Sequence, residues 1–125
     1  MNGGNMINPI IESVKFEGFI EKRESLIKEI MNWMINITPR MVSDDEEKFL
    51  LEISKRKVIK GRYYLSKKQF SWLCTIAWRN NFGAKITHEN YDKWKFILKY
   101  AWFSKQYFKN IMQTINHMEK QLNLN

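Results

Sequence analysis

The sequence predicts an all-α fold, a single compact domain of about five helices. Two capping boxes, Ser43 with Glu46 and Ser66 with Gln69, each mark the start of a helix. After these starts, apolar residues recur at the spacings of three and four that place them on one helical face. A chain of 125 residues, 44% hydrophobic and 14% aromatic, is large enough to bury one continuous core, but not two.

The first element is expected to begin at Asn8-Pro9, an N-cap followed by proline at the first helical position. Residues 1–8, rich in glycine and asparagine, are expected to form a flexible N-terminus. Gly18 is a candidate break in the helix, after which apolar residues keep helical spacing up to Thr38-Pro39. Residues 9–125 form the single helical domain in this interpretation.

The second helix starts at the capping box of Ser43. Asp44 and Asp45 lie in its first turn, where negative charge is favourable, and three cations, Lys55, Arg56 and Lys57, follow near its end. We call residues 9–52 the acidic scaffold half of the chain. Residues 53–125 make up a basic, aromatic half.

The segment Val58 to Leu65 is either a connecting loop or a short hairpin-like excursion around Gly61, and we favour the loop. Ser66 then caps a helix that is expected to run through Arg79 and to end near Gly83. Cys74 falls on the inward face of this helix. Trp72 and Trp78 flank its basic stripe, either as rim residues that cover the core or as a stacking platform.

Thr87 is the expected cap of a helix that extends to about Phe103. Its aromatic residues Phe96, Tyr100 and Phe103 share an outer arc with lysines, which indicates either a binding face or a central helix buried on several sides. Ser104 either caps a separate last helix or lets the same one continue. The last segment has an apolar stripe at Ile111, Ile115, Met118 and Leu122.

Charge is distributed unevenly along the chain, whose net charge is +8. Residues 53–109 hold fourteen of the 21 lysines and arginines, but only two acids, Glu89 and Asp92. The same residues include four of the five tryptophans and all five tyrosines. Cations interleaved with aromatic rings are typical of surfaces that contact phosphates and stack bases.

The candidate nucleic-acid-binding residues surround the start of the Ser66 helix. The cations expected to contact phosphates are Lys55, Arg56, Lys57, Lys60, Arg62, Lys67, Lys68 and Arg79, and the rings expected to stack are Tyr63, Tyr64 and Trp72. Like charges at this density repel one another unless an anion lies near. That anion could be nucleic acid, the acidic half of the chain, or counterions in solvent.

No enzymatic motif is present, so we expect no catalytic residue, no metal and no cofactor. His88 and Asp92 have a spacing that can hold a metal, but they lack a third ligand, and a role at the helix start explains them better. The chain has one cysteine and no apolar run of about 20 residues, so we expect a cytoplasmic protein without membrane contact.

The stretch from Phe49 to Arg79, FLLEISKRKVIKGRYYLSKKQFSWLCTIAWR, resembles a helix-loop-helix segment of small phage and mobile-element accessory proteins. In those proteins a helix with a basic end meets a helix that starts with LSxKQ. The resemblance implies an accessory protein of phage replication, transcription or host takeover. It implies no catalytic residue.

Together these features favour a non-catalytic nucleic-acid-binding accessory protein, with single strands preferred over sequence-specific duplex binding. The alternative is a protein-interaction module, such as a phage-encoded inhibitor or regulator that binds a host protein. Aromatic residues and arginine also anchor protein interfaces, so composition does not separate the two. The salt dependence of binding does. Oligomeric state is left open.

Overall fold

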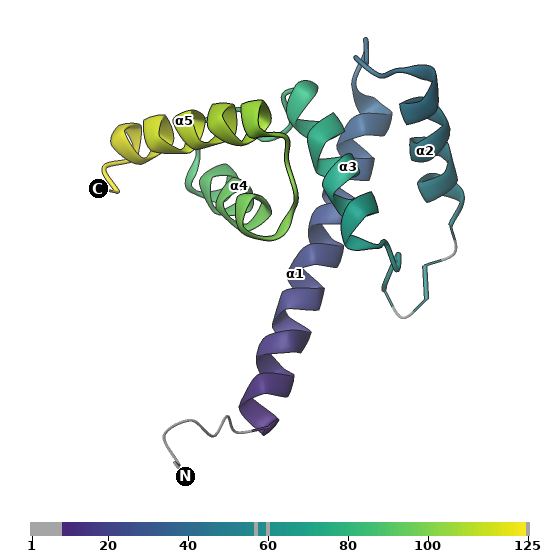
Figure 1. Cartoon of the computed structure of the whole chain (residues 1–125), viewed down its shortest axis with the longest axis horizontal. Helices are drawn as coiled ribbons and strands as arrows, with labels where there is room; N and C mark the ends of the chain where they lie inside the picture. Colours follow the sequence, from purple (N-terminus) through teal and green to yellow (C-terminus); the bar gives the residue numbers. More distant parts are fainter. Residues whose placement is uncertain (1–8, 57, 60, 125) are drawn as a thin grey trace.

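The computed structural model describes residues 9–56, 58–59 and 61–124, with side chains from Gly18 onward. The expected N-terminus 1–8 lies outside the described residues. In the described part of the chain the fold is all-α, as predicted, and has five helices. These are α1 (Pro9–Asn36), α2 (Asp44–Lys55), α3 (Lys67–Arg79), α4 (His88–Tyr100) and α5 (Lys105–Gln121) (Figure 1).

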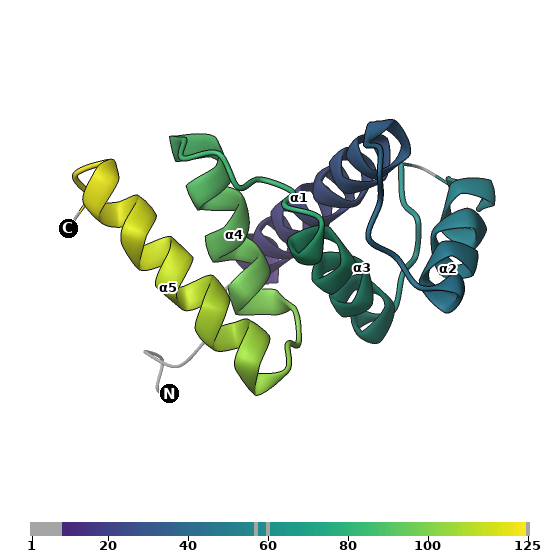
Figure 2. The same cartoon turned by 90° about the horizontal axis from the view of Figure 1, so that it is seen from above.

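Helix α3 lies at the centre of the arrangement. Figures 1 and 2 both place it between α2 on one side and the α4 and α5 pair on the other. The longest helix, α1, packs against α3, and α4 packs against α5. The loop before α3 and the connection to α4 lie at opposite ends of α3 (Figure 1).

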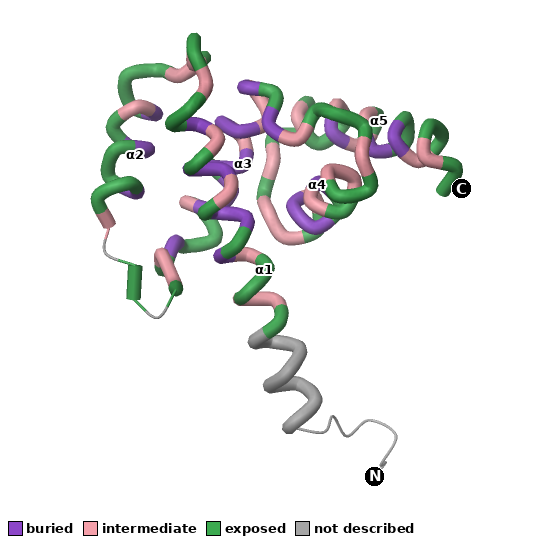
Figure 3. The backbone as a smooth tube through the Cα atoms, turned by 180° about the vertical axis from the view of Figure 1, so that it is seen from behind, coloured by how far each residue is buried: buried purple, intermediate pink, exposed green. Residues whose placement is uncertain are grey.

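One hydrophobic core joins all five helices. Figure 3 colours the backbone by burial and shows buried residues on the sides of the helices that face one another. The predicted stripe of α5 is largely confirmed, because Ile111, Ile115 and Met118 are buried and Leu122 is half-buried. Cys74 is also buried, as its position on the helical wheel predicts. The halves of the chain share this core, which is why the acidic half and the basic half fold together as one domain.

Helix capping decides where the helices begin. Both predicted boxes are formed: the amide of Glu46 donates to Ser43 Oγ at 3.2 Å, and the amide of Gln69 donates to Ser66 Oγ at 3.1 Å. Ser104 caps a separate helix, so α4 ends at Tyr100 and does not reach Phe103. Local side-chain to backbone bonds of this kind satisfy donors that would otherwise lack partners.

The expected break at Gly18 is wrong, because α1 is continuous from Pro9 to Asn36. A Cβ at Gly18 would have no atom within 4 Å, so no contact forces the chain to turn there. A glycine inside a helix costs only about 1 kcal/mol relative to alanine. The packing of the apolar residues that follow, such as Leu26 and Ile30, is sufficient to offset a cost of this size.

The aromatic residues of α4 are buried or half-buried and pack against the core. Trp94 is 1% exposed, and Phe96 is also buried, with its ring centroid 5.7 Å from Phe19 and 4.7 Å from Tyr100. Trp78 packs edge-on against Trp94 at 5.0 Å. Helix α4 is thus covered by both α1 and α3. Of the two alternatives for its aromatic residues, the structure favours a central helix buried on several sides over a binding face.

Candidate nucleic-acid interface

The connection before α3 is a loop that contains one hairpin-like turn, so it combines the two alternatives for Val58 to Leu65. Ile59 and Arg62 form an isolated antiparallel bridge, with backbone bonds of 3.1 and 3.0 Å. Gly61 has a φ of +75°, a left-handed conformation that glycine adopts without steric cost. The turn carries Arg62, which is half-buried.

Side chains from α1 and α2 hold this loop against the body. Glu24 Oε2 accepts a bond of 2.9 Å from the amide of Tyr63, and Arg23 donates through Nη2 to the carbonyls of Leu65 and Ser66. Arg56 donates through Nη1 to the carbonyl of Tyr63 at 3.2 Å. These charged side chains therefore bond to loop backbone groups, such as the amide of Tyr63 and the carbonyl of Leu65, that lie outside the helices.

Two exposed tryptophans flank the N-terminal turn of α3. Trp72 is 38% exposed and stacks on Phe49 of α2, with ring centroids 4.2 Å apart and planes 18° apart. Trp102, which precedes α5, is 59% exposed, and Lys67 Nζ lies 4.6 Å from its ring centroid. The amide of Trp102 donates to Ser71 Oγ at 2.7 Å, and this bond fixes the segment beside α3.

Lys67 and Lys68 are the first two residues of α3, and both are exposed. Lys68 is four residues before Trp72, so the two share one face of the helix. Among the described residues, neither lysine forms an ion pair with an acid. We call the set Lys67, Lys68, Trp72 and Trp102 the tryptophan-lysine face.

The other candidate residues have different positions. Lys55 is exposed at the end of α2, Tyr64 is 55% exposed, and Tyr63 and Arg62 are half-buried. Lys57 and Lys60 lie outside the described residues. Arg56 is held by the loop carbonyls and by Glu52 at 3.2 Å, which gives it a structural role.

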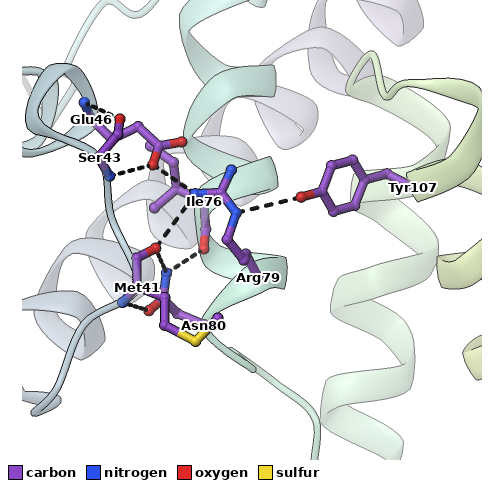
Figure 4. Close-up of polar contacts among 7 residues, drawn as sticks. All are labelled: Met41, Ser43, Glu46, Ile76, Arg79, Asn80 and Tyr107. Atoms are coloured by element: carbon purple, nitrogen blue, oxygen red, sulfur yellow. Dashed lines mark hydrogen bonds and ion pairs between the residues drawn. The ribbon is translucent and has the colours of Figure 1, made fainter.

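Arg79 is at the opposite end of α3 from the tryptophan-lysine face, inside a polar network (Figure 4). Its Nη1 donates to Glu46 Oε1 at 2.6 Å and to the carbonyl of Met41 at 3.4 Å, and its Nε donates to Tyr107 Oη at 3.4 Å. The hydrogen bond to Glu46 raises the pKa of Arg79 above its ordinary value. Arg79 therefore joins α2, α3 and α5, which makes it part of the fold.

The acidic half partly neutralises the basic half. Glu46 pairs with Arg79, and Glu29 pairs with Lys93 at 2.6 Å. Burial alone would lower the pKa of Lys93, but its hydrogen bonds to Glu29 and Glu89 outweigh burial and raise it. Glu24, Glu29 and Glu46 of the acidic half thus contact the loop before α3, helix α4 and the end of α3, respectively. They do not pair with the lysines of the tryptophan-lysine face.

Trp102 was not among the residues predicted from sequence. Its signal was a pair of aromatic residues, Trp102 and Phe103, directly before the helix cap Ser104. A helix that runs to Phe103 places Phe103 on its outer arc, and this interpretation assigns no role to Trp102. Phe103 packs on the core, whereas Trp102 turns outward beside Lys67.

No group of three His, Cys, Asp or Glu side chains in the described residues is arranged to hold a metal ion. Burial raises the pKa of the Cys74 thiol well above its ordinary value, so this side chain is a packing residue and a poor nucleophile. Within the described part, no helix combines the length and the apolar character needed to cross a bilayer.

Comparison of the chain with protein-family models, with curated proteins and with solved structures found no match.

Proposed function

We propose that the protein binds single-stranded nucleic acid, without catalysis, through the tryptophan-lysine face. The observation that supports this most strongly is that two exposed tryptophans flank two adjacent lysines to which no described acid is paired. Aromatic rings beside cations bind single strands because bases stack on the rings while phosphates contact the cations. The bases of a duplex are already stacked, so they cannot use the rings in this way.

Each residue of the face has a distinct role in this proposal. Lys67 and Lys68 contact successive phosphates. One side of the Trp72 ring is covered by Phe49, so a base stacks on its other side. Trp102 provides the second stacking plane. Lys55 and Tyr64, both exposed, extend the surface toward the end of α2.

Fluorescence anisotropy of labelled single-stranded and duplex oligonucleotides at about 50 and 200 mM salt tests the proposal. We expect tighter binding of the single strand and a steep loss of affinity at the higher salt. The double substitution K67E/K68E should abolish binding with little change in melting temperature. The control K109E/K120E makes the same change in net charge at two exposed lysines of α5 and should weaken binding only modestly.

A single substitution separates stacking from charge. Trp102→Ala removes an exposed ring and leaves every cation in place. Loss of one stacked base is expected to weaken binding about 5- to 150-fold, from the roughly 1–3 kcal/mol that stacking contributes per base. Binding that is unchanged by Trp102→Ala, or that is equal for K67E/K68E and its control, would contradict the proposal.

A second candidate function is protein binding, which a groove between α4 and α5 favours. The groove has a volume of about 370 Å³ and apolar walls that include Leu98, Phe108 and Met112. Phe108 is 46% exposed, and Lys95 and Lys99 also line the groove. An acidic amphipathic helix matches both features, because its apolar side would fill the groove and its acids would meet the lysines. The protein could then be a phage-encoded inhibitor or regulator.

Salt and one substitution distinguish the two functions. A complex anchored in the groove should persist at about 200 mM salt, tolerate K67E/K68E and be lost on Phe108→Ser. Nucleic-acid binding should show the reverse pattern: sensitivity to salt and to K67E/K68E, and tolerance of Phe108→Ser. Sedimentation or size-exclusion chromatography of the purified components would measure the complex.

A further inference from the structure

A small pocket adjoins the tryptophan-lysine face. It lies between α1, the start of α3 and the end of α4, and its volume is about 220 Å³. Its lining residues are Phe19, Arg23, Lys67, Phe70 and Tyr100. Lys67 belongs both to this pocket and to the tryptophan-lysine face, so a strand bound on the face would pass the pocket mouth.

The walls of the pocket are aromatic and are held in place by the core. The rings of Phe19 and Tyr100 lie 4.6 Å apart at 59°, and both pack on Phe96. Phe70 is 1% exposed. Because these rings are fixed by contacts within the fold, the pocket exists before any ligand binds, which reduces the entropy lost on binding.

The charge of the pocket is positive. Arg23 Cζ lies 5.0 Å from the ring centroid of Phe70, and Arg23 Nη2 is oriented by the carbonyls of Leu65 and Ser66. Lys67 supplies the second cation. Among the described residues no acid lines this pocket, whereas four other pockets each include a glutamate in their walls.

A ligand for this site should be planar, small and attached to an anion. Aromatic walls favour a flat ring system, and two cations favour a phosphate beside it. The volume is below the roughly 300–1,000 Å³ of pockets for drug-sized ligands, so it suits one ring system and not several. A single nucleotide has these properties.

We propose that the pocket receives one base of the bound strand, turned out of the stack, while its phosphate contacts Lys67 and Arg23. This inference rests on the proposed function, because the strand is delivered by the tryptophan-lysine face. The affinity of the tryptophan-lysine face then increases with the length of the strand, whereas the pocket encloses a single base.

The first test maps the site on the intact protein. Amide ¹H–¹⁵N spectra are recorded during titration with thymidine 5′-monophosphate, and separately with deoxyribose 5-phosphate and with inorganic phosphate. We expect the monophosphate to shift the amides of Phe19, Arg23, Phe70 and Tyr100, and the two base-free phosphates to shift the amide of Arg23 at most and to leave those of the three aromatic residues unchanged. Equal shifts with all three compounds would reduce the pocket to a simple anion site and overturn the inference.

The second test combines a substitution with a change in the strand. Abasic strands lose stacking on Trp72 and Trp102 as well, so their weaker binding alone would not identify the pocket. Tyr100→Ala removes one wall and should weaken binding of an intact strand at least about 5-fold, but leave binding of the matched abasic strand unchanged. If Tyr100→Ala weakens both strands alike, the wall acts only through the fold and the inference fails.

The two proposals fail in different ways. If strands bind the tryptophan-lysine face, but the monophosphate leaves the pocket amides unshifted, the proposed function stands and the base pocket is overturned. If no strand binds at about 50 mM salt, the proposed function is overturned, and the monophosphate spectra decide the pocket by themselves. Melting curves of Tyr100→Ala show whether the variant is folded before its affinity is interpreted.

Discussion

The two ends of α3 carry cations in opposite settings. At the C-terminal end, Arg79 is bound to Glu46 and Tyr107. At the N-terminal end, Lys67 and Lys68 are exposed and contact no acid within the described residues. The comparison shows that the positive charges of the basic half, residues 53–125, do not form one binding surface. Part of it holds the helices together, and part of it remains accessible to a ligand.

The connections at the two ends differ in the same way. After α3, Asn80 is buried and bonds to both backbone groups of Met41, and Gly83 lies against the ring of Trp94. Before α3, Gly61 has open space around it. A ligand-binding segment is expected to be the less tightly packed of the two, because binding surfaces require exposed groups.

Gly83→Ala should have the largest effect on stability. Its φ of +65° is unfavourable for alanine, and the new Cβ would lie 2.7 Å from Trp94 Nε1, which donates to the carbonyl of Phe82. The conformational cost and the displaced ring together should lower the free energy of unfolding by about 3 kcal/mol. Urea unfolding would measure it. A loss under about 1 kcal/mol would mean that Trp94 moves aside easily and that this connection is not tightly packed.

Glu46→Gln tests the ion pair at the same end. Burial opposes ionisation of Glu46, but hydrogen bonds from Arg79 and Ser43 outweigh burial and lower its pKa below the ordinary value of 4.5. A carboxyl whose pKa is lowered by folding stabilises the protein above that ordinary value, and the stabilisation is lost as pH falls through the lowered pKa. Glutamine keeps the capping bond and removes the charge. We expect a loss of about 1–2 kcal/mol near pH 7 that disappears in acid.

Urea unfolding across this pH range checks the prediction. The matched control is Glu47→Gln, because the pair of Glu47 with Arg40 has a similar geometry at 2.7 Å but a more exposed carboxylate. It should cost well under about 1 kcal/mol. A difference between Glu46→Gln and the parent protein that does not change with pH would show that the charge of Glu46 contributes little to the contrast between the two ends.

Features that depend on neighbouring residues could be predicted from the sequence. A capping box such as Ser66 with Gln69 is a local arrangement of backbone and side chain, so its four-residue pattern is sufficient to locate the helix start. The inward position of Cys74 follows from helical periodicity in the same way. Both predictions are confirmed because the surrounding fold does not oppose them.

Features that depend on residues distant in sequence could not be predicted in this way. A helical wheel shows one inward face, but α4 is covered from two sides, and only the placement of Phe19 reveals that Phe96 is buried. The composition of the Ser66 helix likewise suggested that Arg79 would contact phosphates. Its actual partner, Glu46, is 33 residues away in sequence, and nothing local to Arg79 identifies it.

Gly61→Ala probes the connection before α3 and should have a smaller effect than Gly83→Ala. The φ of +75° carries a conformational cost for alanine of about 1 kcal/mol, but no atom lies within 4 Å of the new Cβ. Only the first of the two penalties at Gly83 therefore applies. Comparison of the two urea midpoints measures the difference in packing directly. Equal losses would remove the contrast between the two connections.

Lys68→Ala should have the smallest effect, and it sharpens the comparison most. An exposed lysine without an acidic partner is expected to change the free energy of unfolding by no more than about 0.5 kcal/mol. Arg79→Ala, by contrast, removes the partner of a buried carboxylate and should cost several times as much. If oligonucleotide affinity falls for Lys68→Ala, whereas stability falls for Arg79→Ala, the two ends of one helix serve separate purposes. A stability loss for Lys68→Ala as large as that for Arg79→Ala would instead make both ends structural.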